Sequence, residues 1–185
     1  MSMAKITKRI AGLGTGILTL VGCNMNATTN PLEEASFRQG RFQEVMRIEA
    51  FDECKDEALT LDRQARSRES TGAYLTSATI MQKCNTDLSG DTRGVAESER
   101  MRLGALATLN FLKGGDAEKA RHSLEQFKTS FPKKDLYFTD GSSFVQTTEL
   151  LLGNSGNIGF GRFSTMNVNT DVKNEMRRLS HWKNK

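Results

Sequence analysis

Residues 104–132, GALATLNFLKGGDAEKARHSLEQFKTSFP, decide the fold. Apolar residues recur at helical spacing on both sides of Gly114-Gly115-Asp116, so the sequence predicts two helices joined by a tight turn. The expected buried face of the first helix carries Leu103, Leu106, Ala107, Asn110 and Phe111. That of the second helix carries Ala117, Ala120, Leu124 and Phe127. Such a hairpin cannot cover both apolar faces by itself, so we expect neighbours of the same kind.

The same stretch resembles a tetratricopeptide repeat. The family has an aromatic residue, a small residue nine later, a large apolar residue four later and a proline eight later, and these are Phe111, Ala120, Leu124 and Pro132. The Trp, Leu and Gly that the pattern has in the first helix are replaced by Gly104, Ala107 and Thr108. The resemblance implies an all-α fold in which antiparallel helical hairpins stack as a short solenoid.

Two further glycines suggest earlier hairpins. Gly72 stands where Gly115 stands in the later hairpin, and residues 73–84 form the expected helix after it. Gly40 is expected to separate a short helix over 32–39 from a longer one that begins at residue 42 and continues to residue 69. Residues 31–152 would then hold three hairpins, the family's usual minimum for a stable stack.

The first 22 residues have the pattern of an export signal. A basic start with no acid precedes an uncharged run over 10–22, which is shorter than the roughly 20 apolar residues that span a bilayer. Leu20-Val21-Gly22-Cys23 resembles a bacterial lipoprotein cleavage box. The resemblance implies removal of residues 1–22, lipid on Cys23, and a flexible tether over 23–30. An ordinary secretory signal cut near Asn26-Ala27-Thr28 is the alternative.

This processing also predicts where the protein lies. Because Asn24 and not Asp follows the cysteine, the resemblance favours the periplasmic side of the outer membrane over the inner membrane. The processed chain would have a net charge of +1, from 23 basic and 22 acidic residues. No basic excess that would attract nucleic acid remains, so nucleic acid is not an expected partner.

Two cysteines remain after lipidation, Cys54 and Cys84. An exported chain meets an oxidising compartment, so the pair is a disulfide candidate, with two buried free thiols as the alternative. The acids over 49–57 are interpreted as a solvated helix face, and Asp87 and Asp91 as turn residues of a loop over 85–95. We expect no metal site and no cofactor.

The C-terminal part is expected to contain two more helices. One runs from Ser142 or Ser143 to residue 152 and closes the stack, with Phe144, Val145, Thr148, Leu151 and Leu152 facing inward. A glycine-rich linker over 153–161 and a short extended segment over 162–169 precede a basic amphipathic helix that starts at Thr170 or Asp171. That helix either docks on a partner or an anionic membrane, or packs back on its own domain.

Catalytic motifs are not found in the sequence. We therefore interpret the chain as a non-catalytic scaffold for other proteins of an envelope assembly, such as a secretion, pilus or conjugation apparatus. Its groove would be lined by the first helix of each hairpin, with Arg63, Asn110 and Phe111 as candidate binding residues. A second contact would involve Met176, Arg177, Leu179 and Trp182. A peptidoglycan-acting enzyme or activator is the alternative, a structural lipoprotein is a third, and the oligomeric state stays open.

Overall fold

The computed structural model describes residues 31–88, 90–153 and 165–183. The predicted signal, the lipidation site Cys23, the tether and most of the 153–161 linker lie outside these residues. Within them the regular structure is helical, apart from one isolated bridge between Tyr137 and Ser143, which confirms the all-α prediction. Among the described helices none combines the length and the apolar character that crossing a membrane requires.

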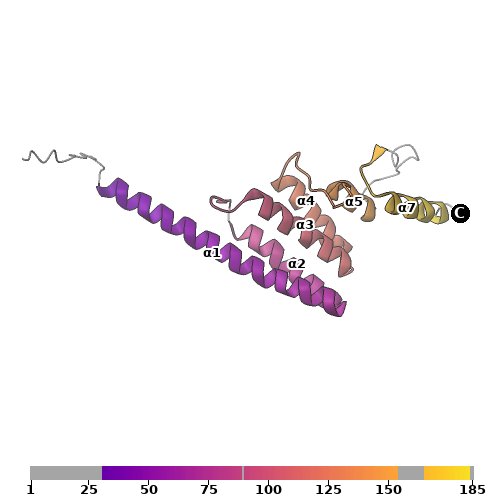
Figure 1. The fold of residues 1–185 in the computed structure, drawn as a ribbon, viewed down its shortest axis with the longest axis horizontal. Coiled ribbons are helices and arrows are strands. Elements are labelled where there is room, and N and C mark those ends of the chain that lie inside the picture. The colour runs from indigo at the N-terminus through magenta and orange to yellow at the C-terminus, as the bar shows by residue number, and fades with distance from the viewer. Residues whose placement is uncertain (1–30, 89, 154–164, 184–185) are drawn as a thin grey trace, which may run out of the picture.

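The described helices are α1 (Pro31–Arg68), α2 (Thr71–Thr86), α3 (Glu97–Lys113), α4 (Ala117–Ser130), α5 (Phe144–Leu151) and α7 (Thr170–Lys183). Helices α1 to α4 form two antiparallel hairpins, and each helix packs on the one before it (Figure 1). The first half of α1 extends well beyond the other helices, and α7 lies at the opposite end of the molecule (Figure 1). The stack is therefore short and linear.

Gly40 lies inside α1, so the predicted turn there and the third hairpin are wrong. A single glycine weakens a helix by only about 1 kcal/mol relative to alanine. Ion pairs one turn apart flank the glycine, from Arg38 to Glu34 and from Arg41 to Glu44. Such pairs stabilise a helix locally, and a helix of 38 residues continues through the weak point.

The turn between α1 and α2 lies at Glu69 and Ser70, not at Gly72 as predicted. Glu69 has a φ of 50°, and the Ser70 hydroxyl accepts a hydrogen bond from the Ala73 backbone N–H. Gly72 falls in the first turn of α2. A serine cap satisfies one of the free N–H groups at a helix start, so the cap and not the glycine sets this boundary.

The second hairpin follows the sequence prediction closely. Gly115 has a φ of 81°, a conformation that favours glycine, and Asp116 caps α4 by accepting from the Lys119 N–H at 2.9 Å. Ala120, Leu124 and Phe127 are buried as expected, whereas Ala117 is exposed. The turn therefore lies at the predicted residues.

The core has two adjoining parts. Phe51, Met81 and Leu103 belong to the part between α1, α2 and α3, and Phe111 and Leu124 to the part that joins α3, α4 and α5. Cys54 and Cys84 form a disulfide with a Cα–Cα distance of 5.7 Å, which confirms the predicted pair. The bridge ties α1 to α2 across the first part of the core.

Helix α5 closes the last face of the stack. Phe144 packs on Phe127 with ring centroids 5.0 Å apart, and Ser143 caps the helix as predicted. Leu151, expected to face inward, is 46% exposed. Its neighbour Leu150 is buried instead, against Val168.

Helix α7 begins at Thr170, as predicted, and its first half packs on its own domain. Val172 and Met176 are partly buried against Leu150 and Val168. Asn169 donates to Asp140 at 2.7 Å just before the helix starts. Of the predicted extended segment over 162–169, the structure describes residues 165–169. Residue 165 is helical, and residues 167–169 have no regular secondary structure. The prediction of a short extended segment over 162–169 stays a prediction.

Candidate functional site

The structure buries two of the three predicted groove residues, Asn110 and Phe111, and exposes the third, Arg63. Asn110 and Phe111 have no exposed area, and the Asn110 amide donates to Asp62 at 2.9 Å. Arg63 is exposed on α1 but donates to Thr60 on the same helix. Asn110 and Phe111 do lie on the predicted buried face, so their assignment to a partner groove is wrong.

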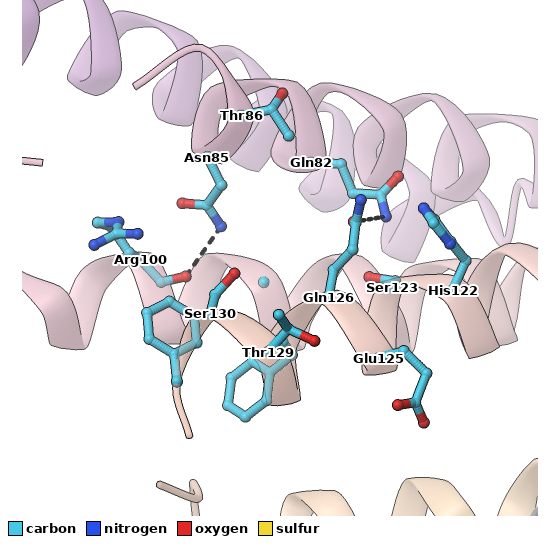
Figure 2. A pocket seen from close by; sticks show the side chains of 13 residues that line it. Gln82, Asn85, Thr86, Arg100, His122, Ser123, Glu125, Gln126, Thr129 and Ser130 are labelled. Carbon is cyan, nitrogen blue, oxygen red and sulfur yellow. Dashed lines mark hydrogen bonds between the residues drawn. The ribbon is translucent and has the colours of Figure 1, made fainter. Parts of the chain in front are cut away.

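A groove of about 350 Å³ lies between α2 and α4, next to α3 (Figure 2). We call it the α2–α4 groove. Helix α2 contributes Gln82, Asn85 and Thr86, and α3 contributes Arg100 and Gly104. The other lining residues lie on or directly after α4: His122, Ser123, Glu125, Gln126, Phe127, Thr129, Ser130 and Phe131. The second helices of the hairpins, not the first, therefore form its walls.

Aromatic side chains form the apolar floor of the α2–α4 groove. Phe127 and Phe131 have ring centroids 5.2 Å apart, and the Arg100 guanidinium lies 5.4 Å from the Phe131 ring. The cation and the ring attract each other, which holds the end of α4 against the start of α3. The floor is thus fixed before any ligand binds.

Gly104 opens the floor between the two walls. A Cβ atom built there would lie 3.5 Å from both Asn85 Nδ2 and Phe127 Cδ2, which is ordinary contact distance. A larger side chain would extend into the space that the groove occupies. The tetratricopeptide pattern has a tryptophan at this position, so its replacement by glycine is the sequence signal that could have located the groove.

Amides and hydroxyls line the rim. Gln82 donates to Gln126 at 3.0 Å and joins α2 to α4 across the groove, as Figure 2 shows. Thr129 and Ser130 are exposed on the α4 side. Neutral donors and acceptors of this kind match the N–H and C=O groups of a peptide.

Two buried polar atoms of residues that line the groove have no hydrogen-bond partner among the described residues. Asn85 donates through Nδ2 to the Arg100 carbonyl at 3.1 Å, but its Oδ1 atom is unpaired. Arg100 Nε is the second such atom. Buried polar groups are nearly always paired in folded proteins, so these two atoms, one on α2 and one on α3, are exceptions beside the groove.

A more open groove of about 280 Å³ lies on the α1 and α3 side, where the sequence placed the binding surface. Its apolar residues are Leu59, Leu103 and Leu106, and its charged residues are Lys55, Glu99 and Arg102. Hydrogen bonding to Asp52 raises the pKa of Lys55 above its usual value, so this lysine is charged and paired. Lys55 also pairs with Glu99 at 3.5 Å, so these two charges are engaged within the chain.

The predicted C-terminal contact is split between buried and exposed residues. Met176 is partly covered by the domain, and Arg177 donates to Asn174 at 3.2 Å. Leu179 is 42% exposed, and the Trp182 side chain lies outside the described atoms. The structure therefore assigns Met176 mainly to the docking of α7 on its own domain.

The α2–α4 groove also contains a histidine and a buried serine hydroxyl. His122 is exposed on the rim, and the Ser123 hydroxyl is buried 2.8 Å from the Thr108 hydroxyl. In the part of the chain that the structure describes, there is no group of three or more His, Cys, Asp or Glu residues that could hold a metal ion. The arrangement offers hydrogen bonds around an apolar floor.

The resemblance to tetratricopeptide repeats rests on sequence positions in the α3–α4 hairpin. The α1–α2 hairpin departs from the pattern, because its first helix is 38 residues long. Comparison of the chain with protein-family models, with curated proteins and with solved structures found no significant match.

Proposed function

We propose that the chain is a lipid-anchored, non-catalytic scaffold of the bacterial cell envelope. In this proposal the α2–α4 groove holds a short segment of a partner protein. The observation that carries the proposal is the groove itself, with an aromatic floor and a polar rim that includes amides and hydroxyls. Mostly apolar concave sites with a few placed polar groups are typical binding sites.

The shape of the site favours a peptide over a small molecule. The lining residues extend along α4 from His122 to Phe131, more than two helical turns, and the groove is open along this length. Helix-in-groove binding places the apolar side chains of the bound segment on an apolar floor, and Phe127 and Phe131 provide such a floor. The partner segment would thus carry one or two large apolar side chains between polar ones.

The cell-envelope location is supported by two features. Leu20 to Cys23 form the lipoprotein-like box, and a single cut there leaves Cys23 to carry the lipid. The Cys54–Cys84 disulfide suits an oxidising compartment, since such bridges are rare in the cytosol. Two or three acyl chains would hold the domain stably at the membrane surface, with the outer membrane as the proposed site.

Radiolabelled palmitate tests the anchor. The wild-type chain is expected to incorporate the label and fractionate with membranes, whereas Cys23→Ser is expected to lose the label. Cys54→Ser combined with Cys84→Ser is the matched control, because it changes cysteines without touching the box. Absence of label from the wild-type chain would refute the anchor.

Site-specific photo-crosslinking in living cells tests the groove. A photoreactive residue at Thr129, on the rim, is expected to link the chain to a discrete envelope protein. The same residue at Thr60, which is exposed on α1 away from the groove, is the control. Equal adducts from both positions, or none from Thr129, would contradict a role for the groove.

A further inference from the structure

The first half of α1 carries large apolar side chains on the outside of the molecule. Leu32 is 79% exposed, Phe42 64%, Val45 46% and Met46 48%. Figure 1 shows this half of the helix extending past the other helices, and the loop at residues 91–94 contacts it only near its end, at Glu44, Arg47 and Ile48. Exposed apolar groups gathered on one element of a folded domain mark an interaction surface.

Phe42, Val45 and Met46 lie on one face of α1, and charged residues lie before and after them on the same face. Along this face Glu34 and Arg38, which form an ion pair with each other, come first, then Phe42, Val45 and Met46, and then the acids Glu49, Asp52 and Glu53. The spacings of three and four residues keep all of them on one side of the helix. This outer face is opposite to Phe51, Ala58 and Ala65, which are buried against the domain.

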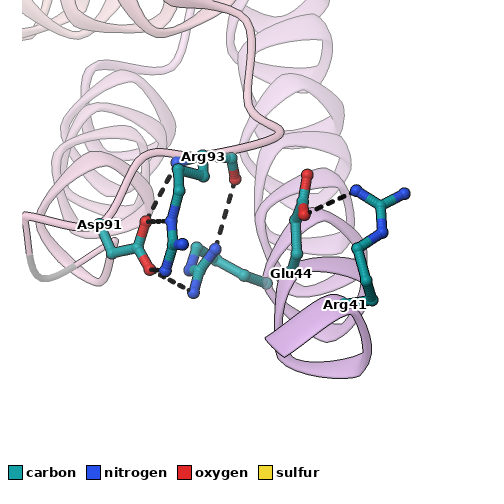
Figure 3. Close-up of polar contacts among 5 residues, drawn as sticks. Arg41, Glu44, Asp91 and Arg93 are labelled. Atoms are coloured by element: carbon teal, nitrogen blue, oxygen red, sulfur yellow. Dashed lines mark hydrogen bonds and ion pairs between the residues drawn. The ribbon is translucent and has the colours of Figure 1, made fainter. Parts of the chain in front are cut away.

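The loop before α3 fixes the direction of the outer face. Arg47 forms an ion pair with Asp91 at 2.6 Å and donates to the Arg93 carbonyl at 3.3 Å (Figure 3). A Cβ atom at Gly94 would lie 2.5 Å from Ile48 Cδ1, so this loop lies directly on α1. Arg47 and Ile48 thus face the domain, which leaves Phe42, Val45 and Met46 pointing away.

We propose that two copies of the chain pair antiparallel through this outer face of α1. With the two-fold axis at the level of residues 44 and 45, Phe42 of one copy meets Met46 of the other, and the two Val45 side chains meet each other. Arg38 then faces the turn from Glu49 to Asp52 of the other copy. In this direction the acids over 49–53 of one copy lie beside Arg38 of the other copy and not beside the same acids.

The charges argue against the other occupants of this face. A parallel pair would place Arg38 beside Arg38 and Glu49 beside Glu49, and like charges at an interface repel. An anionic membrane surface would repel Glu49, Asp52 and Glu53, which continue the same face and are not buried. A second copy in the antiparallel direction satisfies both the apolar and the charged part.

Cysteine cross-linking of the full chain tests the pairing and its direction. In the antiparallel pair, Val45→Cys places two thiols next to each other, whereas the two copies of Ala35→Cys lie roughly 27 Å apart along the axis at 1.5 Å per residue. After mild oxidation we expect a dimer of twice the chain mass from Val45→Cys. Ala35→Cys should give no more dimer than the wild-type chain. The wild-type chain is the control for a disulfide between two copies through Cys23.

Each other outcome overturns the proposal. Dimer from both Ala35→Cys and Val45→Cys would indicate a parallel pair, in which each residue lies beside its own copy. No dimer from either would mean that copies do not associate here. An adduct of Val45→Cys at a different mass would show that another protein covers the face. None of these outcomes depends on the α2–α4 groove or on the lipid.

Second-site changes in the Val45→Cys chain test the contacts. Phe42→Glu should reduce the dimer yield at least tenfold, while Gln43→Glu, the same charge change on an adjacent exposed residue off the face, should leave it unchanged. Arg38→Glu should also reduce the yield, and adding Glu49→Arg should restore it. Equal loss from Phe42→Glu and Gln43→Glu, or no rescue by the charge exchange, would refute the antiparallel register.

Discussion

Asn110 Nδ2 lies 2.9 Å from Asp62 Oδ1 in the middle of the stack, where it joins α3 to α1. Asp62 is 2% exposed and pairs through its other oxygen with Arg66 at 2.6 Å. Asn110 also donates to Ser77 of α2 at 3.3 Å, so one amide connects three helices. A polar residue with this position holds the hairpins in register and is not available to a partner.

Asn110→Ala should therefore lower the free energy of unfolding by about 2–3 kcal/mol, because a hydrogen bond to a buried carboxylate is lost and that oxygen stays unpaired. Urea unfolding measures the change. Arg63→Ala, beside Asp62 in sequence but exposed, is the control and should stay within about 0.5 kcal/mol. Similar losses from both variants would contradict the structural role of Asn110.

Removal of the disulfide should destabilise the α1–α2 hairpin. The bridge joins residues separated by 30 positions, and closing a loop of that length stabilises by about 3–4 kcal/mol on the chain-entropy model. Thermal unfolding with and without reductant measures the effect. The double variant Cys54→Ala and Cys84→Ala should unfold at the lower temperature in both conditions, and a further response to reductant would argue against this bridge.

Gly40 and Gly115 should respond in opposite directions to alanine. At Gly40 no atom lies within 4 Å of the added Cβ and the helix is regular, so Gly40→Ala should slow hydrogen exchange in the first half of α1. At Gly115, φ is 81°, so Gly115→Ala should cost about 1–2 kcal/mol of stability. Faster exchange near residue 40 in Gly40→Ala would mean that α1 does break there.

Acid should loosen the docking of α7. Hydrogen bonds from Ser142 and Asn169 lower the pKa of Asp140 to about 2 from an ordinary 3.8. The contribution of the ionised group is complete above pH 3.8 and is lost as the pH falls through about 2. Amide NMR shifts of residues 167–169 should titrate with that low midpoint. Asp140→Asn should abolish the titration, and a midpoint near 4 in the wild-type chain would contradict this contact.

The sequence predicted the elements that local chemistry determines. The turn at Gly115, the cap at Ser143 and the start of α7 depend on residues next to one another, and all lie where the pattern indicated. The break at Gly40 was wrong because one glycine cannot outweigh the many residues that favour helix on both sides. Local propensity was sufficient only where a cap or a positive φ enforced it.

The candidate binding site could not be predicted from local sequence in the same way. Asn110 has a polar side chain that suggests a surface, and only its partners Asp62 and Ser77, which lie far away in sequence, explain why it is buried. The α2–α4 groove depends on how α2 and α4 lie across α3, which no single segment specifies. Gly104 was the local signal for the groove, since it stands where a repeat of this kind has a large side chain.

The most direct measurement of the central claim compares two substitutions of Gly104 by photo-crosslinking from Thr129 in living cells. Gly104→Ala adds one methyl group at ordinary contact distance and should leave the adduct unchanged. Gly104→Leu should fill the floor of the groove and reduce the adduct at least tenfold, while the purified chain keeps its helical circular dichroism. A folded Gly104→Leu chain that cross-links as well as Gly104→Ala would contradict the claim that the α2–α4 groove holds the partner.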